Sequence, residues 1–389
     1  MKLRSCVLAA VLVTATACGT SGGGGGSGAT LELFQIGPIE SQTASLPMLQ
    51  TGAQAAVDEI NAAGGVHGKQ IKLTTCNDRY DANEALRCAQ EGARGDAVAL
   101  VGSLSNFGAQ VLPVLEEAGL PSIGADAITP VDAQSTANYL FDPGVPAFAG
   151  MPFVAAQQMG ATKIASIHIE TAGTATTQSY FDLGAKAAGV QNVAVYEIPA
   201  DTLDYATYIA QATAAGAQVF VSSMSPEANL KLWKAIADAG SPIKVVASAG
   251  TVSEAVITEA GAAAEGSYVV AGTPDANPTN PTGQAFTAAL QKYSPGTASS
   301  GLGLRAWASV HLFAEVAGGI QGDVTRESLT AALNQVDGLD FLWIDGLSFA
   351  KPGPIAELPR IASATVFPSR IQGGKLVPLD SLDPFGATP

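Results

Sequence analysis

The fold class follows from one short stretch of the chain, Gly216-Ala217-Gln218-Val219-Phe220-Val221. Its last three residues are apolar and of the strand-forming kind, with no polar residue between them. A strand that is apolar on both sides is typical of a parallel sheet covered by helices on both faces. The segment therefore predicts a buried strand over residues 218–222 in a parallel α/β sheet.

From Leu31 onward, short β-rich runs alternate with Ala-rich helical patterns along the rest of the chain. We expect strands at 31–36, 70–75, 97–101, 121–124, 163–169, 193–198, 218–222, 244–247 and 267–271. We expect helices at 47–62, 82–94, 106–118, 146–159, 176–188, 205–215, 226–239, 252–260, 283–292, 302–317 and 325–334. This alternation predicts a doubly wound α/β architecture.

Local signals mark several helix ends. Asp81 followed by Glu84 matches a capping box at the start of the second helix. Gly64-Gly65 and Gly240 stand where their helices should stop, because glycine readily adopts the left-handed conformation that ends a helix.

A chain of 389 residues is too long for one compact core and suits two lobes. Polar segments rich in Pro and Gly predict crossovers between the lobes at 139–145 and 274–281, and a third is expected near 338–344. One lobe would then comprise 31–142 plus 275–338, and the other 143–274 plus 339–380.

The amino terminus has the layout of a secretory signal. Lys2 and Arg4 precede an apolar run at 7–13, and the small residues 15–17 come directly before Cys18. This order predicts a signal peptide over 1–17 and lipid attachment at Cys18, followed by a flexible Gly/Ser linker over 18–30. An ordinary secreted protein with a chance cysteine near its cleavage site is the alternative.

The remaining cysteines are Cys76 and Cys88, since Cys6 would be lost with the signal. In an exported protein such a pair predicts a disulfide. A metal site is not expected, because the three histidines (His67, His168 and His311) are far apart and lack ligand spacing.

The net charge and the lack of enzyme motifs restrict the classes of function that we expect. The net charge is −15 with 19 Lys plus Arg, which argues against nucleic acid, because binding to it depends on cations that neutralise phosphates. The nucleophile, zinc and phosphate-loop motifs of common enzymes do not occur. We therefore expect no cofactor and no catalysis.

The chain resembles the periplasmic binding proteins of the branched-chain amino-acid (Leu/Ile/Val-binding) type, which are the substrate-binding components of ABC importers. The residues that carry the resemblance are 52–69, 101–105, 118–123, 216–221 and 346–349. The resemblance implies two α/β lobes joined by three crossover strands, the type I fold, which close like a hinge on a small solute. It also implies ABC-importer permease subunits as partners, an extracytoplasmic location and a monomer.

Loops at the carboxyl ends of parallel strands are the expected binding site. In the first lobe the resemblance places the ligand-carboxylate loop at 103–108, and it places residues that hold the ligand backbone after the fourth strand. The candidates there are Ser103, Ser105, Asn106, Phe107, Asp126, Ala127 and Thr129. Ser105 or Asn106 could equally serve only as a helix cap, and Asp126 could be a cap or a surface residue.

The candidates in the second lobe follow three of its strands. They are Glu170, Thr171, Ala172, Met224 and Ala249. Amino-acid-binding relatives place an acid for the ligand ammonium in the segment that corresponds to Ser248-Ala249-Gly250-Thr251, and that acid is missing here. A standard aliphatic amino acid is therefore not assumed as the solute, although Glu170 or Asp126 could substitute for the acid.

These features predict an extracytoplasmic solute-binding lipoprotein of an ABC importer that captures a small polar or amino-acid-like solute. A sensor that signals to a membrane partner through the same cleft is the first alternative. A secreted enzyme is the second alternative.

Overall fold

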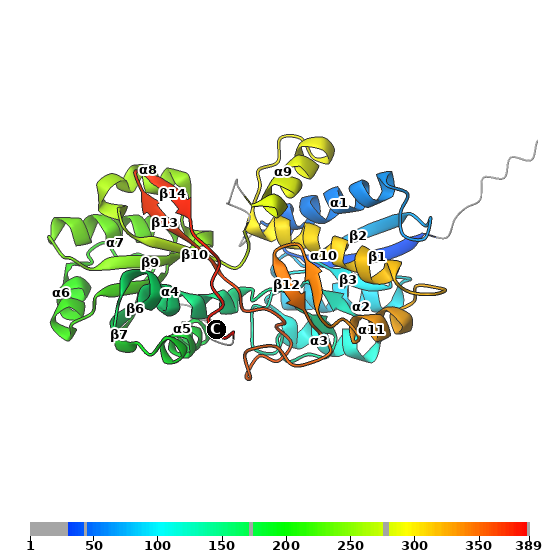
Figure 1. Ribbon diagram of the computed structural model, residues 1–389, viewed down its shortest axis with the longest axis horizontal. Coiled ribbons are helices and arrows are strands. Elements are labelled where there is room, and N and C mark those ends of the chain that lie inside the picture. The colour runs from blue at the N-terminus through cyan, green and yellow to red at the C-terminus, as the bar shows by residue number, and fades with distance from the viewer. Residues whose placement is uncertain (1–29, 43–44, 171–173, 275–279, 387–389) are drawn as a thin grey trace, which may run out of the picture.

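Two separate sheets organise the computed structural model, which describes residues 30–42, 45–170, 174–274 and 280–386. The first sheet has the strand order β2-β1-β3-β4-β5, and all its strand pairs are parallel. Its strands are β1 (Leu31–Gly37), β2 (Ile71–Asn77), β3 (Ala99–Val101), β4 (Ser122–Ile123) and β5 (Asn138–Tyr139). The two sheets lie in separate halves of the molecule (Figure 1).

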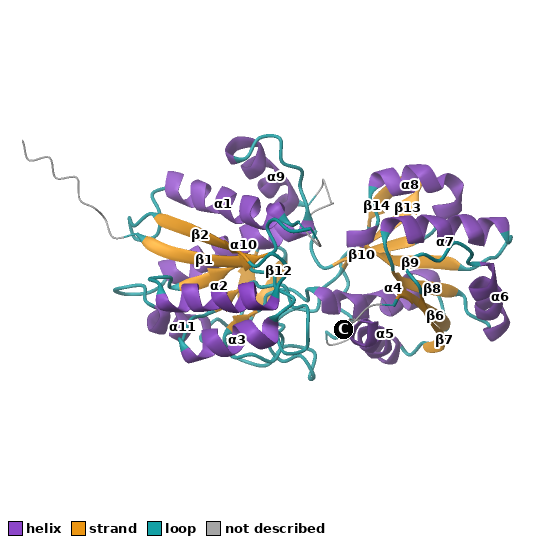
Figure 2. Ribbon diagram, turned by 180° about the vertical axis from the view of Figure 1, so that it is seen from behind, coloured by secondary structure: helices purple, strands orange, loops and turns teal. Residues whose placement is uncertain are grey.

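Helices cover both faces of the first sheet (Figure 2). One face packs with α1 (Pro47–Ala62) and α10 (Gly301–Gly318), whose side chains share one apolar core with β1 and β3. The other face packs with α2 (Ala82–Arg94) and α3 (Gly108–Glu117). The remaining helices of this half are α9 (Pro281–Tyr293) and α11 (Arg326–Leu333). The first lobe is therefore built from segments on both sides of the second lobe in sequence.

The second sheet has the order β14-β13-β10-β9-β8-β6-β7. Its parallel strands are β6 (Lys163–Ile169), β7 (Gln191–Ile198), β8 (Val219–Ser223), β9 (Lys244–Ser248) and β10 (Tyr268–Ala271). Two strands from the end of the chain, β13 (Phe367–Gln372) and β14 (Lys375–Pro378), add antiparallel pairs. The helices of this half are α4 (Gly150–Met159), α5 (Thr174–Ala188), α6 (Ala206–Ala215), α7 (Pro226–Asp238) and α8 (Glu254–Ala260).

Strand β8 confirms the prediction made from its sequence. It lies between β6 and β9 in the sheet. Val219 and Val221 are buried in the core on one face with α4 and α5, and Phe220 is buried in the core on the other face. Because both faces are covered by helices, an uninterrupted apolar run is the pattern that buries this strand.

The predicted helix ends are also largely confirmed. The Asp81 carboxylate accepts hydrogen bonds from the backbone N–H groups of Asn83 and Glu84 at the start of α2. Gly64 and Gly240 have φ angles of 110° and 58° just after their helices. Positive φ costs little for glycine, so these residues end the helices as expected.

The third crossover was expected at 338–344, and that position is wrong. The structure has an antiparallel hairpin there, formed by β11 (Leu339–Phe341) and β12 (Ile344–Leu347). Apolar residues of the hairpin join the core of the first lobe, so the chain stays on that side. It passes to the second lobe only later, where Ala362 N–H donates to Leu140 O and the chain then enters β13. Part of the second expected crossover, 275–279, lies outside the described residues.

Within the described residues, no helix combines the length and the apolar character needed to cross a membrane. The predicted signal peptide, Cys18 and nearly all of the linker lie outside the described part of the chain. The expectation of a lipid anchor therefore rests on the sequence alone.

Candidate functional site

Two loops at the carboxyl edge of the first sheet lie side by side and carry the first-lobe candidates. Strands β3 and β4 pair in parallel, with Val101 opposite Ile123. The loops that follow them, residues 102–107 and 124–129, start at the same edge and are joined by a hydrogen bond from Asp126 N–H to Ser103 O. The parallel register thus brings Ser103, Ser105 and Asp126 together around one small cavity.

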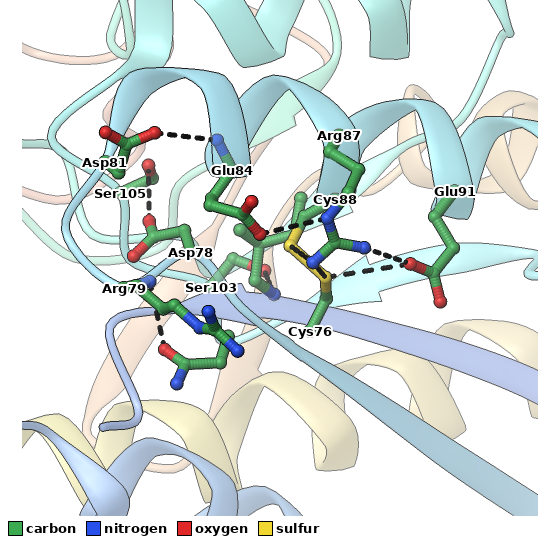
Figure 3. The surroundings of a disulfide bond; sticks show 12 residues. Cys76, Asp78, Arg79, Asp81, Glu84, Arg87, Cys88, Glu91, Ser103 and Ser105 are labelled. Atoms are coloured by element: carbon green, nitrogen blue, oxygen red, sulfur yellow. Dashed lines mark hydrogen bonds and ion pairs between the residues drawn. A yellow bond between two sulfur atoms is a disulfide. The ribbon is translucent and has the colours of Figure 1, made fainter. Parts of the chain in front are cut away.

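Both serines of the first loop already make hydrogen bonds within the protein. Ser103 Oγ accepts from Ile36 N–H at 3.0 Å. Ser105 Oγ donates to Asp78 Oδ2 at 2.9 Å (Figure 3). Burial raises the pKa of the Asp78 carboxyl, although the hydrogen bonds from Tyr80 and Ser105 oppose that shift. With its proton directed to Asp78, Ser105 presents its oxygen mainly as an acceptor.

The residues after Ser105 open helix α3, which begins at Gly108, two residues later than predicted. The N-cap position is Phe107, and no side chain caps the helix there. Phe107 packs edge-on against Tyr80, with ring centroids 6.0 Å apart, and Asn106 is half-buried. The alternative of a side-chain cap by Asn106 is therefore not what this helix uses, whereas Ser105 Oγ accepts from Phe107 N–H at 3.3 Å.

The second loop is held by Asp132, which the sequence reasoning missed. Asp132 Oδ2 accepts from Thr129 Oγ1 at 2.8 Å, and also from the N–H groups of Thr129 and Ile128. Burial is the main cause that raises the pKa of Asp132. A Cβ on Gly108, the first residue of α3, would displace the Asp132 carboxylate from this position.

Asp126 is neither a helix cap nor a surface residue. It is 8% exposed, and its Oδ2 lies 2.8 Å from Arg305 Nη1. Arg305 Nε also donates to both carboxylate oxygens of Asp142, at 2.9 and 2.7 Å. Asp126 Oδ1 is buried and has no hydrogen-bond partner among the described residues. Arg305 was missed by the sequence reasoning, although a single cation in the apolar stretch of α10 was a signal that could have found it.

A small cavity lies behind the two loops. Its volume is about 30 Å³, and the polar residues that line it are Ser103, Ser105, Ser122, Asp126, Asp132 and Asn138. Pockets that enclose a small molecule usually have ~300 Å³ or more. The first-lobe half of the site therefore does not enclose a solute by itself.

The second-lobe candidates lie in different environments. Glu170 is exposed at the end of β6, and its N–H donates to Ile198 O. Met224 is 3% exposed and packs in the apolar core with α7, while Ala249 is half-buried directly after β9. Thr171 and Ala172 lie outside the described residues. Of these candidates, Glu170 presents a carboxylate at the strand end.

The segment 248–251, which contains no acid, is held by hydrogen bonds between neutral groups. Thr251 Oγ1 donates to Ser248 O at 2.8 Å and accepts from Asn229 Nδ2 at 3.0 Å. These bonds fix the short turn after β9 without a charged group.

The two lobes meet at α5. Tyr180 packs in a buried apolar cluster with Ala127 and Ala133 of the first lobe. Its hydroxyl has no hydrogen-bond partner among the described residues, and burial raises the pKa of Tyr180 to about 12. The loop that carries Asp126 and Thr129 therefore also contacts the second lobe through Ala127.

The predicted disulfide between Cys76 and Cys88 is present and ties β2 to α2 (Figure 3). It lies two residues before Asp78, so it holds the strand end that carries the partner of Ser105. No cluster of three or more His, Cys, Asp or Glu side chains suited to a metal ion occurs in the described ranges.

The sequence matches the family model described as periplasmic binding protein over residues 36–353. The chain belongs to the periplasmic binding protein family. Membership of this family implies an extracytoplasmic location.

Individual relatives agree with this assignment. The chain is 31% identical over 259 residues to the Leu/Ile/Val-binding protein homolog 1 of Brucella suis biovar 1 (strain 1330). That match covers 60% of this chain and 64% of the Brucella protein, so the chain spans less than two thirds of that relative's length.

Solved structures share the fold. A putative branched-chain amino acid ABC transporter protein from Rhodospirillum rubrum superposes with a TM-score of 0.73 at 21% identity, covering 90% of this chain and 100% of that one. The substrate-binding protein LivJ from Streptococcus pneumoniae str. Canada MDR_19A, solved in complex with isoleucine, has a TM-score of 0.69 at 19% identity, covering 90% and 99%. The α/β architecture described above is therefore the type I periplasmic binding protein fold.

Proposed function

We propose that this protein is the solute-binding lipoprotein of an ABC importer and that it captures a small polar or amino-acid-like solute between its two lobes. The observation that carries the proposal is the family match over residues 36–353, together with two adjacent strand-end loops that present hydroxyl and carboxylate groups. Loops at this edge are where open parallel sheets bind ligands. The protein would act by binding and release, without catalysis.

The proposal includes the anchor and the lobes. Cys18 would carry lipid, and the linker that follows would let the lobes reach the permease subunits of the importer. The first lobe would end near 142 and resume after 275, and the second would begin at 143. The later crossover near Ala362 extends the first lobe beyond the boundary at 338 expected from the sequence.

The candidate site favours a solute that donates hydrogen bonds. Ser105 faces the solute mainly as an acceptor because its proton is directed to Asp78. Asp126 is paired with Arg305, and the 248–251 segment has no acid. A solute with hydroxyl or amide N–H groups would meet acceptors in the first lobe, whereas a lone carboxylate would meet repulsion from Asp78.

A thermal-shift screen of residues 30–389 against amino acids, amides, polyols and small organic acids tests the proposal. A compound present at one hundred times its dissociation constant should raise the free energy of unfolding by about 2.7 kcal/mol. The hits should be donor-rich compounds, and Thr129→Ala should reduce their effect more than Thr258→Ala, which removes an exposed hydroxyl on α8. Absence of any shift across the library would contradict solute capture.

A further inference from the structure

Arg305 forms ion pairs with two segments of the chain, one in a crossover between the lobes and one in the candidate site. Its guanidinium lies between Asp142, in the crossover that leads to the second lobe, and Asp126, in the candidate solute loop after β4. The three residues are 3 to 8% exposed, so water screens these charges little. Each of the three side chains comes from a different part of the first lobe.

Backbone contacts reinforce the same junction. Asp142 Oδ1 accepts from Gly144 N–H at 3.0 Å, and Ala127 O accepts from Val145 N–H at 3.1 Å. The crossover is therefore tied to the solute loop through Arg305 and through the Val145 hydrogen bond. Along the crossover, Val145 is the last residue that makes one of these contacts.

Gly144 marks the point where the crossover leaves the first lobe. Its φ is 59°, a conformation that side chains with a Cβ rarely adopt. A Cβ there would lie 2.5 Å from Asp126 Oδ1 and 2.8 Å from Ala127 N. The next residues form a 3₁₀ turn, Val145–Ala149, that packs against α5 of the second lobe. The chain is thus bound to the first lobe up to Val145, and the 3₁₀ turn that begins there packs against the second lobe.

We propose that Arg305 is a positioning residue that fixes the crossover to the solute loop, so that the two lobes hold a defined relative orientation. This proposal rests on the proposed function and adds the link between site and hinge. Arg305 suits the role because its Nε donates to both carboxylate oxygens of Asp142, while its Nη1 forms an ion pair with the Asp126 carboxylate at 2.8 Å. Loss of Arg305 leaves two buried carboxylates that repel each other, and the crossover is then free to move away from the loop.

The test measures the distance between the lobes without any solute. Spin labels at Glu117→Cys in α3 and Lys231→Cys in α7, with the Cys76–Cys88 disulfide intact, report the interlobe distance distribution by pulsed electron resonance. We expect one narrow distribution for the wild type. Arg305→Gln and Asp142→Asn should each widen it at least twofold or shift its mean.

Arg326→Lys is the matched control. Arg326 donates to the backbone oxygens Ala97 O, Ala93 O and Gly95 O, all in the first lobe and away from the crossover. The Arg326→Lys variant should have a lower melting temperature than the wild type and an unchanged interlobe distance distribution. If Arg305→Gln does not fold, Asp142→Asn decides the question, since it keeps the Arg305 and Asp126 charges paired.

Distributions identical to the wild type in folded Arg305→Gln and Asp142→Asn, with only the melting temperature lowered, would overturn the proposal and leave Arg305 a stabilising residue. Because the measurement uses no solute, that result would not bear on solute capture. A failed solute screen, in turn, would leave the interlobe measurement valid.

Discussion

Hydroxyl groups at the candidate site are held by buried carboxylates. Ser105 donates to Asp78, and Thr129 donates to Asp132. Neither carboxylate was predicted from the sequence, because each belongs to a segment outside the loops that carry the candidates. The hydroxyl residues themselves could be predicted, since they follow strands directly. A residue's place after a strand can be predicted locally, whereas the pairing of Ser105 with Asp78, 27 residues away in the sequence, depends on the tertiary fold.

His168 is a residue whose protonation should affect stability. It is 1% exposed in β6, stacks on Phe181 at 6.2 Å, and neither ring nitrogen has a partner among the described residues. Burial lowers the pKa of His168, and the charges of Glu197 and Asp182 oppose this shift. The unfolded chain therefore binds a proton at a higher pH than the folded one.

We expect the free energy of unfolding to fall as the pH drops from about 6.5, the pKa of an unperturbed histidine, toward the lower pKa of folded His168. His168→Phe should remove part of this slope. Urea denaturation between pH 7.5 and 5 measures it, and the double variant with His311→Gln controls for the other histidine whose pKa burial lowers. An unchanged slope in His168→Phe would show that His168 does not titrate in this range.

At the scale of elements, helices α1 and α10 approach each other closely. A Cβ on Gly52 would lie 2.2 Å from Gly303 O and 2.9 Å from Gly303 Cα. The two helices come from opposite ends of the first lobe's sequence, and they share its main core. Their close approach needs glycine at position 52, and the sequence pattern alone did not indicate it.

Gly52→Ala should push α1 away from α10 and lower the free energy of unfolding by about 1 to 3 kcal/mol, the usual cost of inserting a methyl group into a packed interface. Gly318→Ala is the matched control, since it lies in α10 with nothing within 4 Å of its Cβ position. That variant should be neutral or slightly stabilising, because alanine has the better helix propensity. Chemical denaturation of both variants gives the comparison, and equal stabilities would contradict the close-contact argument.

Helices and strands with a long sequence pattern were predicted well. The short hairpin, whose position depends on its packing against the core, was not. Helices α1 and α2 and strand β6 have the predicted bounds, because their patterns are long and periodic. The hairpin of β11 and β12 was taken for a crossover, since each strand has only three or four residues. Its position is set by burial of Phe341 and Ile344 against the first-lobe core, which a short segment does not reveal.

At the scale of the whole molecule, the arrangement of carboxylates around the proposed site would decide which solutes fit. Asp126 is paired within the protein, and no acid lies in the 248–251 segment. Glu170 is the exposed carboxylate at the end of β6. A zwitterionic amino acid would therefore have to rely on Glu170 for its ammonium group and would face Asp78 behind the carboxylate loop.

We expect leucine to bind weakly to this protein. Burying a leucine side chain stabilises a complex by about 1.5 to 3 kcal/mol, whereas an ammonium group buried without a partner costs several kcal/mol. Titration calorimetry with leucine should show no submicromolar affinity. If such affinity is found, Glu170→Gln should abolish it and Asp238→Asn, at the far end of α7, should not. That pair of results would show that Glu170 has replaced the missing acid and that the solute is an ordinary amino acid after all.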